Sequence, residues 1–317
     1  MATHEVVVLA LPHVLPLDLA IPVQVFAPRD QTPYRARVCA LEPQVPTSGG
    51  FSLLVDADLA TARRADTLVV PGYSPYDVEM DDVVVELIAG MRARGRRVVS
   101  ICTGAFALAQ AGVLDGRRAT THWQATDLLA ARFPAIDVVE DVLYVDDGDV
   151  LTSAGVSAGL DLCLHIVRRD YGAAAANTVA RALVAAPHRD GGQAQFIDAP
   201  TSAGPDGSLA PTRAWALQHL AQPLTLSDLA RHAGVSQRTL SRRFTAETGC
   251  TPLQWLLHAR LNHARELLET RDISIDLVAA SCGIGTAANL RLRFRQILST
   301  TPTAYRRTFS HTAGTTH

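Results

Sequence analysis

Two patterns of apolar residues alternate along the first two thirds of the chain. Short, continuous apolar runs rich in valine indicate strands that are buried on both faces, and the segments between them have the spacing of amphipathic helices. Strands that alternate with helices predict a parallel sheet covered on both sides, an α/β flavodoxin-like sandwich. The expected strands are 5–11, 36–42, 67–72 and 96–102, and the expected helices are 18–27, 82–94, 103–112 and 124–132.

The last third has helical periodicity only. Residues 196–212 separate it from the rest, and this stretch is rich in proline, glycine, serine and alanine without a hydrophobic period. Such composition is typical of a linker. The pattern therefore predicts an α/β domain over 1–195, a linker over 196–212 and an all-helical domain over 213–310.

The segment 224–249 predicts a short helix, a tight turn and a second helix. Ser227 can cap the first helix, Gly234 ends it, and Ser236 can cap the second. The inward positions are Leu229, Ala230 and Ala233 in the first helix and Leu240 and Phe244 in the second. A basic outer face on the second helix makes this a helix-turn-helix pattern.

The same pattern returns at 273–298. An amphipathic helix over 251–270 lies between the two units and would hold them at a fixed distance, so that both second helices could enter successive major grooves. The residues expected in equivalent roles are Ser274, Leu277, Ala280, Gly283, Ile284, Leu290 and Phe294.

Charge separates the two parts of the chain. The net charge of −2 conceals a basic C-terminal third, since residues 211–317 hold 13 arginines and 6 acidic residues, whereas 1–210 hold 16 arginines and 25 acidic residues. A basic helical module attached to an acidic domain is typical of nucleic-acid-binding proteins.

The helical third resembles the DNA-binding domain of AraC-family transcription regulators. The tandem units, the RRF, ETG and PLQWL runs at 242–256 and the closing FRQILSTTPTAYRR at 294–307 carry the resemblance, with departures at Ile284 and Ser299. It implies double-stranded DNA as the partner and a set of DNA-contacting residues. These are Arg238, Ser241 and Arg242 in unit one and Ala288, Asn289 and Arg291 in unit two. Arginine can read guanine and asparagine adenine. Because unit two has alanine at positions 287 and 288, we expect unit one to carry most sequence readout.

The stretch SICTG at 100–104 places a cysteine where a buried strand turns into a helix. Ser100 and Gly104 are the small flanking residues that a nucleophile elbow needs. A helix that begins at Thr103 would point its positive end at Cys102 and lower the pKa of the thiol. His122 is a candidate general base.

Residues 4–170 resemble the PfpI-type branch of the class I glutamine amidotransferase-like superfamily. VVPG at 69–72, the run from Ser100 to Trp123 and LTSAGVSAGLDLCLHIV at 151–167 carry the resemblance. It implies an oxyanion site at the amides of Gly72 and Thr103 and an acidic partner for Cys102 at Asp18. Together with the AraC-type part, the architecture resembles GlxA/AdpA-like regulators, in which this domain dimerises and senses.

Three hypotheses for Cys102 stay open. The pocket with Asp18 and His122 binds a small-molecule effector without turnover. Alternatively, the thiolate attacks an electrophilic carbon while Asp18 shuttles protons, as in an isocyanide hydratase. In the third, the elbow is an inherited feature of a domain that only dimerises. Oxidation of an exposed, low-pKa thiol is a further form of sensing. We expect a homodimeric, non-enzymatic regulator, with the hydratase as the alternative.

Other patterns limit the location and cofactors. No apolar run is long enough to span a membrane, and the N-terminus lacks a basic leader. Five widely spaced cysteines without a CxxC pair predict neither disulfides nor metal, so we expect a cytoplasmic protein without cofactors. The acidic DDGD at 146–149 could hold a cation, but its position between apolar runs favours a hairpin turn. Residues 186–196 are expected to form a loop or strap.

Overall fold

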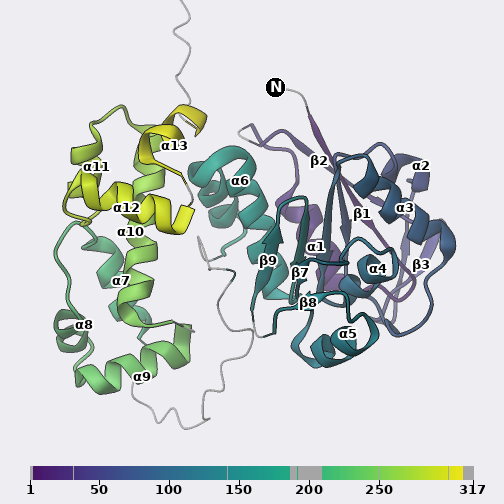
Figure 1. Cartoon of the computed structure of the whole chain (residues 1–317), viewed down its shortest axis with the longest axis horizontal. Helices are drawn as coiled ribbons and strands as arrows, with labels where there is room; N and C mark the ends of the chain where they lie inside the picture. The colour runs from purple at the N-terminus through teal and green to yellow at the C-terminus, as the bar shows by residue number, and fades with distance from the viewer. Residues whose placement is uncertain are drawn as a thin grey trace, which may run out of the picture. The chain divides into compact units, whose positions relative to one another are not determined.

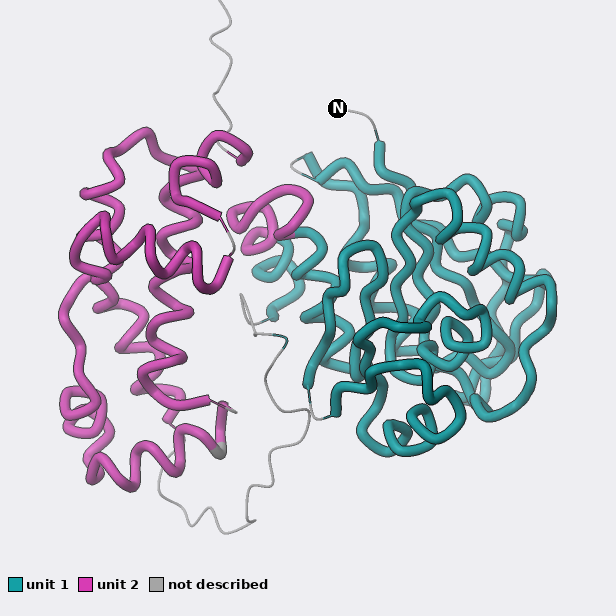
Figure 2. Tube along the Cα trace, in the orientation of Figure 1, with its two compact units in different colours: residues 1–167, 179–196 teal, residues 168–178, 197–317 magenta. Residues whose placement is uncertain are grey.

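A computed structural model describes residues 3–30, 32–140, 142–185, 191, 209–248, 250–298 and 300–309. Two compact units are distinguished in Figure 2. The first comprises residues 1–167 and 179–196, and the second comprises residues 168–178 and 197–317. Helix α6 (Ser157–Ala182) therefore contributes residues to both units.

Figure 1 draws the helices and strands of the whole chain. The first unit contains a six-stranded sheet in the order β2-β1-β5-β6-β10-β9. Its neighbouring strands are parallel except for β9, which pairs antiparallel with β10 at the edge. The strands are β1 (His4–Leu9), β2 (Tyr34–Cys39), β5 (Thr67–Val70), β6 (Arg97–Ile101), β9 (Tyr144–Asp147) and β10 (Val150–Ser153). Two further pairs stand apart: β3 (Gln44–Pro46) with β4 (Ser52–Leu54), and β7 (Arg118–Ala119) with β8 (Asp137–Val138).

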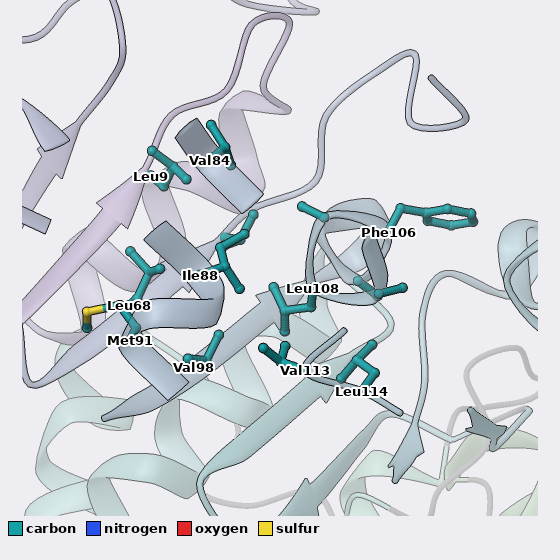
Figure 3. Packing of buried hydrophobic residues seen from close by; sticks show 14 of the residues in the cluster. Leu9, Leu68, Val84, Ile88, Met91, Val98, Phe106, Leu108, Val113 and Leu114 are labelled. Atoms are coloured by element: carbon teal, nitrogen blue, oxygen red, sulfur yellow. The ribbon is translucent and has the colours of Figure 1, made fainter. Parts of the chain in front are cut away.

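Alternate residues of the sheet face two layers of helices. Leu68 and Val98 pack against Ile88 and Met91 of α3 in the main core (Figure 3). Ile101 points to the opposite face, where it lies against Gly159 of α6. The other helical segments of this unit are α1 (Pro16–Val25), α2 (Leu59–Ala62), α3 (Asp82–Ala93), η1 (Cys102–Gly104), α4 (Ala105–Gln110), η2 (Trp123–Ala125) and α5 (Thr126–Arg132).

The predicted α/β sandwich is confirmed. The four expected strands are β1, β2, β5 and β6, each shorter than its apolar run, and the expected helices are α1, α3, α4 and α5. The DDGD segment is a hairpin between β9 and β10, with Gly148 at φ +82° in the turn. Periodicity missed β3, β4, β7 and β8, because two or three residues are too few to show alternation.

The second unit carries seven helices within its described residues from 209 onward, and they form two hydrophobic clusters. One cluster includes Leu240, Phe244 and Leu256, and the other includes Leu268 and Phe294. Because α10 contributes to both, it joins the two helix-turn-helix units, as predicted. The helices are α7 (Ala210–Gln218), α8 (Leu226–His232), α9 (Gln237–Thr248), α10 (Pro252–Thr270), α11 (Ile275–Ser281), α12 (Ala287–Leu298) and α13 (Pro302–Phe309).

The cap of the first helix in unit one is Thr225, so the prediction of Ser227 was wrong. The Thr225 side chain accepts a hydrogen bond from the Asp228 amide, and the Asp228 carboxylate accepts one from the Thr225 amide. This reciprocal capping box satisfies two backbone donors, and it starts the helix at Leu226. The second cap was predicted correctly, since the Ser236 hydroxyl accepts from the Thr239 amide at 3.1 Å.

In the second helix-turn-helix unit, called unit two as above, the buried positions of the first helix are offset by one residue from the prediction. Leu277 and Ala280 are exposed, and Val278 and Ala279 are the buried residues of α11. The reason is the cap: Ser274 takes the place of Thr225, so Val278 and Ala279 match the buried Leu229 and Ala230. Leu290 and Phe294 are buried as expected.

The expected linker ends in a helix, because α7 already begins at Ala210. Residues 196–208, and the expected strap at 186–196 apart from Gly191, lie outside the described residues. The Gly191 carbonyl accepts hydrogen bonds from the amides of Leu143 and Tyr144. Within the described ranges, no helix has both the length and the apolar character needed to cross a membrane.

Candidate functional site

Cys102 sits on a sharp turn between β6 and the short η1 segment. Its φ is +57°, a left-handed backbone conformation that is strained for a residue with a side chain. A Cβ at Gly104 would lie 2.1 Å from the carbonyl oxygen of Val70, so only glycine fits there. The nucleophile-elbow geometry expected from SICTG is therefore present.

The structure brings Asp18 and Gly72 to Cys102. A Cβ on Gly72 would lie 2.6 Å from Asp18 Oδ2 and 3.0 Å from Cys102 Cβ. From the other side, a Cβ on Gly155 would lie 2.8 Å from the Cys102 sulfur. The thiol is consequently enclosed by glycine backbone, with 4% of the residue exposed.

Asp18 is a buried carboxyl group whose two oxygens differ. Oδ1 accepts a hydrogen bond from the Val156 amide at 2.8 Å. Oδ2 has no partner at hydrogen-bond geometry among the described residues, although the Gly72 amide and the Cys102 thiol lie close enough to lower the pKa of the group. Burial outweighs these contacts and raises the pKa of Asp18. A buried acceptor that lacks a well-aligned hydrogen bond is a place where a ligand can bind.

The predicted low pKa of the thiol is wrong. Burial, together with the negative charge of Asp18, raises the pKa of Cys102 to about 12, although the Thr103 amide acts in the opposite direction. The expected helix also starts later than Thr103, since α4 begins at Ala105 and spans only six residues. At neutral pH the sulfur is therefore a thiol and a poor nucleophile, and its burial removes the premise of an exposed redox sensor.

His122 has a different hydrogen-bond partner from the one expected of a base for Cys102. Its Nδ1 accepts a hydrogen bond from the Gln124 amide at 3.4 Å, which caps η2, and no hydrogen bond in the described residues links it to Cys102. Burial lowers the pKa of His122, while the charge of Asp18 opposes that shift. An electrostatic interaction links His122 to Asp18.

Side-chain hydrogen bonds hold the elbow, and only the tertiary structure shows them. Thr103 Oγ1 donates to the Tyr73 carbonyl at 2.9 Å and accepts from the Tyr73 amide at 3.0 Å. Thr121 Oγ1 donates to the Cys102 carbonyl at 2.8 Å. Val156 and Thr121 occur within the runs that carry the family resemblance, which was the one sequence signal for them.

The first helix-turn-helix unit presents two arginines from its second helix, α9. Arg238 and Arg242, one turn apart on α9, are both exposed, whereas Ser241 between them is half-buried. Beneath them, Phe244 is fully buried and packs edge-on against Trp255 of α10 at 5.5 Å between ring centres. The packing of Phe244 thus holds α9 in place while Arg238 and Arg242 face outward.

Unit two presents a different surface on the same scaffold. The candidate DNA-contacting residues Ala288, Asn289 and Arg291 are exposed on α12. Asn289 also donates from Nδ2 to the Ile284 carbonyl at 2.8 Å, so one of its two amide hydrogens stabilises the turn. Counted from the caps Ser236 and Thr286, Ala288 corresponds to Arg238, Arg291 to Ser241 and Leu292 to Arg242.

Comparison with known proteins agrees with this two-part organisation. The DJ-1/PfpI family model matches residues 4–169, and a helix-turn-helix domain model matches residues 229–308. The HTH-type transcriptional regulator CdhR from Pseudomonas aeruginosa is 31% identical, over 80% of this chain and 76% of that protein. The HTH-type transcriptional regulator GlxA from Rhizobium meliloti is 32% identical, over 83% of this chain and 82% of that protein.

Two further similarities concern the first domain. An isonitrile hydratase from Pseudomonas putida is 34% identical, over 56% of this chain and 77% of that protein. The crystal structure of an AraC family transcriptional regulator from Pseudomonas putida has a TM-score of 0.52 at 24% identity, over 57% of this chain and 99% of that one. This structural likeness shows the fold alone. Because the DJ-1/PfpI family model matches half of the chain and the regulators CdhR and GlxA match most of its length, the chain belongs to the DJ-1/PfpI family and joins its DJ-1/PfpI domain to an AraC-type helix-turn-helix region.

Proposed function

We propose that this chain is a sequence-specific DNA-binding transcription regulator. The observation that carries the proposal is the pair of exposed arginines, Arg238 and Arg242, on the second helix of a capped helix-turn-helix unit. A second unit of the same design lies at the other end of α10. The named regulators CdhR and GlxA match the chain through most of its length, which supports the same role.

The geometry of α9 suits the major groove of double-stranded DNA. An α-helix fits that groove, and side chains four residues apart point to the same side of the helix. A guanidinium group can donate two hydrogen bonds to the O6 and N7 atoms of guanine. Because the two residues are only about 6 Å apart along the helix axis, Arg238 and Arg242 can read guanines that lie within a few base pairs of each other in one groove.

Selection of bound sequences from a random DNA library, followed by fluorescence anisotropy on the selected site, tests this function. Arg242→Ala should weaken binding to the selected site by about 1–3 kcal/mol and relax the preference at one base pair. Arg64→Ala is the matched control, because it removes the same charge from an exposed position outside the helix-turn-helix units. Affinity for DNA should fall steeply with rising salt concentration.

Two outcomes would refute the proposal. Failure of the library to converge on a sequence would exclude specific recognition. Equal losses for Arg242→Ala and Arg64→Ala, without any change in base preference, would mean that α9 contributes only general positive charge.

For the DJ-1/PfpI domain we propose dimerisation and the binding of a small ligand beside Cys102. The unpartnered Asp18 Oδ2 supports the ligand, because a donor from a bound molecule would satisfy a buried acceptor. The close approach of Gly72 and Gly155 limits that molecule to a small one. The detection of monomers only by sedimentation equilibrium would refute the proposed dimerisation. Screening of metabolites by thermal shift, with Asp18→Ala as the control variant, tests the proposed ligand binding.

Turnover at Cys102 is the alternative function, and the resemblance to an isonitrile hydratase is what favours it. The pKa of about 12 for the thiol opposes it, since attack on an electrophilic carbon requires thiolate. Incubation of the purified protein with simple isonitriles should leave them unchanged. Formation of the N-formyl product by the intact protein, lost in Cys102→Ser, would establish the enzyme instead.

A further inference from the structure

Helix α6 is two helices joined at one glycine. Gly172 has φ +89° and ψ 175°, which interrupts the helix that runs from Ser157 to Ala182. A second helical stretch thus starts at Ala173, and its first amides lie beyond the reach of helical carbonyls. Arg168 braces the break from within, because its Nη2 donates to Asn177 Oδ1 at 3.1 Å.

A carboxylate from the helix between the two helix-turn-helix units binds these amides. Glu269 of α10 accepts from the Ala173 amide through Oε1 at 2.7 Å and from the Ala174 amide through Oε2 at 2.6 Å. Negative charge is stabilising at a helix N-terminus, and hydrogen bonds to a carboxylate are stronger than neutral ones. A Cβ on Gly172 would lie 2.9 Å from the carboxyl carbon of Glu269, so the contact requires glycine at the break.

Glu269 also supports the recognition helix of unit two. Its Oε1 accepts from the Tyr305 hydroxyl at 2.6 Å, and that hydroxyl accepts from Arg265 Nε at 3.1 Å. The Tyr305 ring packs edge-on against Phe294, the fully buried aromatic residue of α12, with 5.9 Å between ring centres. The same carboxylate therefore contacts α6 and the core beneath α12.

The opposite end of α6 is held at the Cys102 site. Val156, the residue before the helix, has φ +50°, a strained conformation for a β-branched side chain. Its amide donates to Asp18 Oδ1. Strain of this kind persists only where surrounding contacts impose it, so the start of α6 depends on Asp18.

We propose that α6 couples the Cys102 site to DNA recognition by unit two, with Glu269 as the coupling contact. The proposal rests on the proposed function as a DNA-binding regulator. A change of Asp18 or Val156 on ligand binding would alter the start of α6, and Glu269 would pass the change to Tyr305 and α12. Because coupling between two sites is reciprocal in binding free energy, DNA binding should in turn alter the backbone around Val156.

Hydrogen exchange of the full chain, with and without its selected DNA site, tests this reciprocity. In the wild type, DNA should slow exchange in α9 and α12 and should change it at least about threefold in the peptide that contains Val156. In Glu269→Gln the amide nitrogen faces a backbone N–H in place of an acceptor oxygen. The amides of Ala173 and Ala174 should then exchange about tenfold faster, and the effect of DNA at Val156 should disappear.

The control variants separate coupling from folding. Glu266→Gln removes the same charge one turn earlier on α10 and should leave the response to DNA intact. Tyr305→Phe removes only the hydroxyl, and Gly172→Ala disturbs the same contact from α6. Both should reduce the response at Val156 while the protection of α9 by DNA remains.

Distinct outcomes identify what fails. If DNA does not protect α9 in the wild type, the proposed function is wrong. If DNA protects α9 and α12 but exchange at Val156 does not change, the coupling is excluded and the function stands. A full response at Val156 in both Glu269→Gln and Tyr305→Phe would also exclude Glu269 as the coupling contact.

Discussion

The two helix-turn-helix units have nearly the same interior and clearly different outer surfaces. Phe244 and Phe294 occupy matching buried positions, and each packs edge-on against an aromatic ring of a neighbouring helix. On the outer side of the recognition helices, Arg238 and Arg242 of unit one correspond to Ala288 and Leu292 of unit two. Packing restricts the interior to a few solutions, whereas a solvent-facing position can change without loss of fold.

This difference assigns unlike tasks to the units. Two arginines in unit one can donate hydrogen bonds to base edges, but alanine and leucine at the matching places of unit two can only contact apolar groups such as the thymine methyl. Leu292 is 50% exposed, so its apolar side chain faces outward from α12. We therefore expect unit one to supply base readout and unit two to supply position and backbone contacts.

The largest effect should come from the shared interior. Phe244→Ala and Phe294→Ala should each lower the free energy of unfolding of the second unit by about 3–5 kcal/mol, because both leave a cavity. Urea unfolding can be followed through Trp215 and Trp255 in a Trp123→Phe background. A loss under about 1 kcal/mol in one variant alone would show that the two interiors are not equivalent.

Removal of an outward arginine should have the next largest effect. Arg242→Ala should cost about 1–3 kcal/mol in binding to the selected site, while Leu292→Ala at the matching position should cost less than about 0.5 kcal/mol. Fluorescence anisotropy on the same DNA measures both. Equal losses would contradict the assignment of readout to unit one.

The helix caps should give an intermediate effect on stability. Thr225→Ala and Ser274→Ala each remove a side chain that accepts a hydrogen bond from an amide in the first turn, and each should cost about 1 kcal/mol. Thr225 should cost more, because it also shares a capping box with Asp228. Thermal unfolding of the full chain measures the two losses, and a larger loss for Ser274 would contradict this order.

The smallest effect is expected at Arg291. This exposed residue of α12 corresponds to Ser241, so we expect it to contact phosphate. Arg291→Ala should weaken binding by similar factors on selected and random DNA and should reduce the slope of log affinity against log salt by about 1. A selective loss on the selected site would instead give unit two a share of base readout.

Local patterns predicted the elements well and their limits less well. The valine-rich runs identified β1, β2, β5 and β6, and the repeated helix-turn-helix pattern identified both units. The errors in the helix-turn-helix units arose where two side chains could cap the same helix. Thr225 caps α8 in place of Ser227 because Asp228 completes a capping box. In unit two Ser274 takes the place that matches Thr225, so the buried positions are Val278 and Ala279.

By itself, the sequence determined four strands of the main sheet, the division into an α/β part and a helical part, and the repeated helix-turn-helix design, because these follow from periodicity among near neighbours along the chain. Only the tertiary structure decided the state of Cys102 and the partners of Glu269. The thiol keeps its proton because Asp18, Gly72 and Gly155, which are distant in sequence, bury it together. Glu269 meets the amides of Ala173 and Ala174 because Gly172 breaks α6, and no local pattern of residues encodes that meeting.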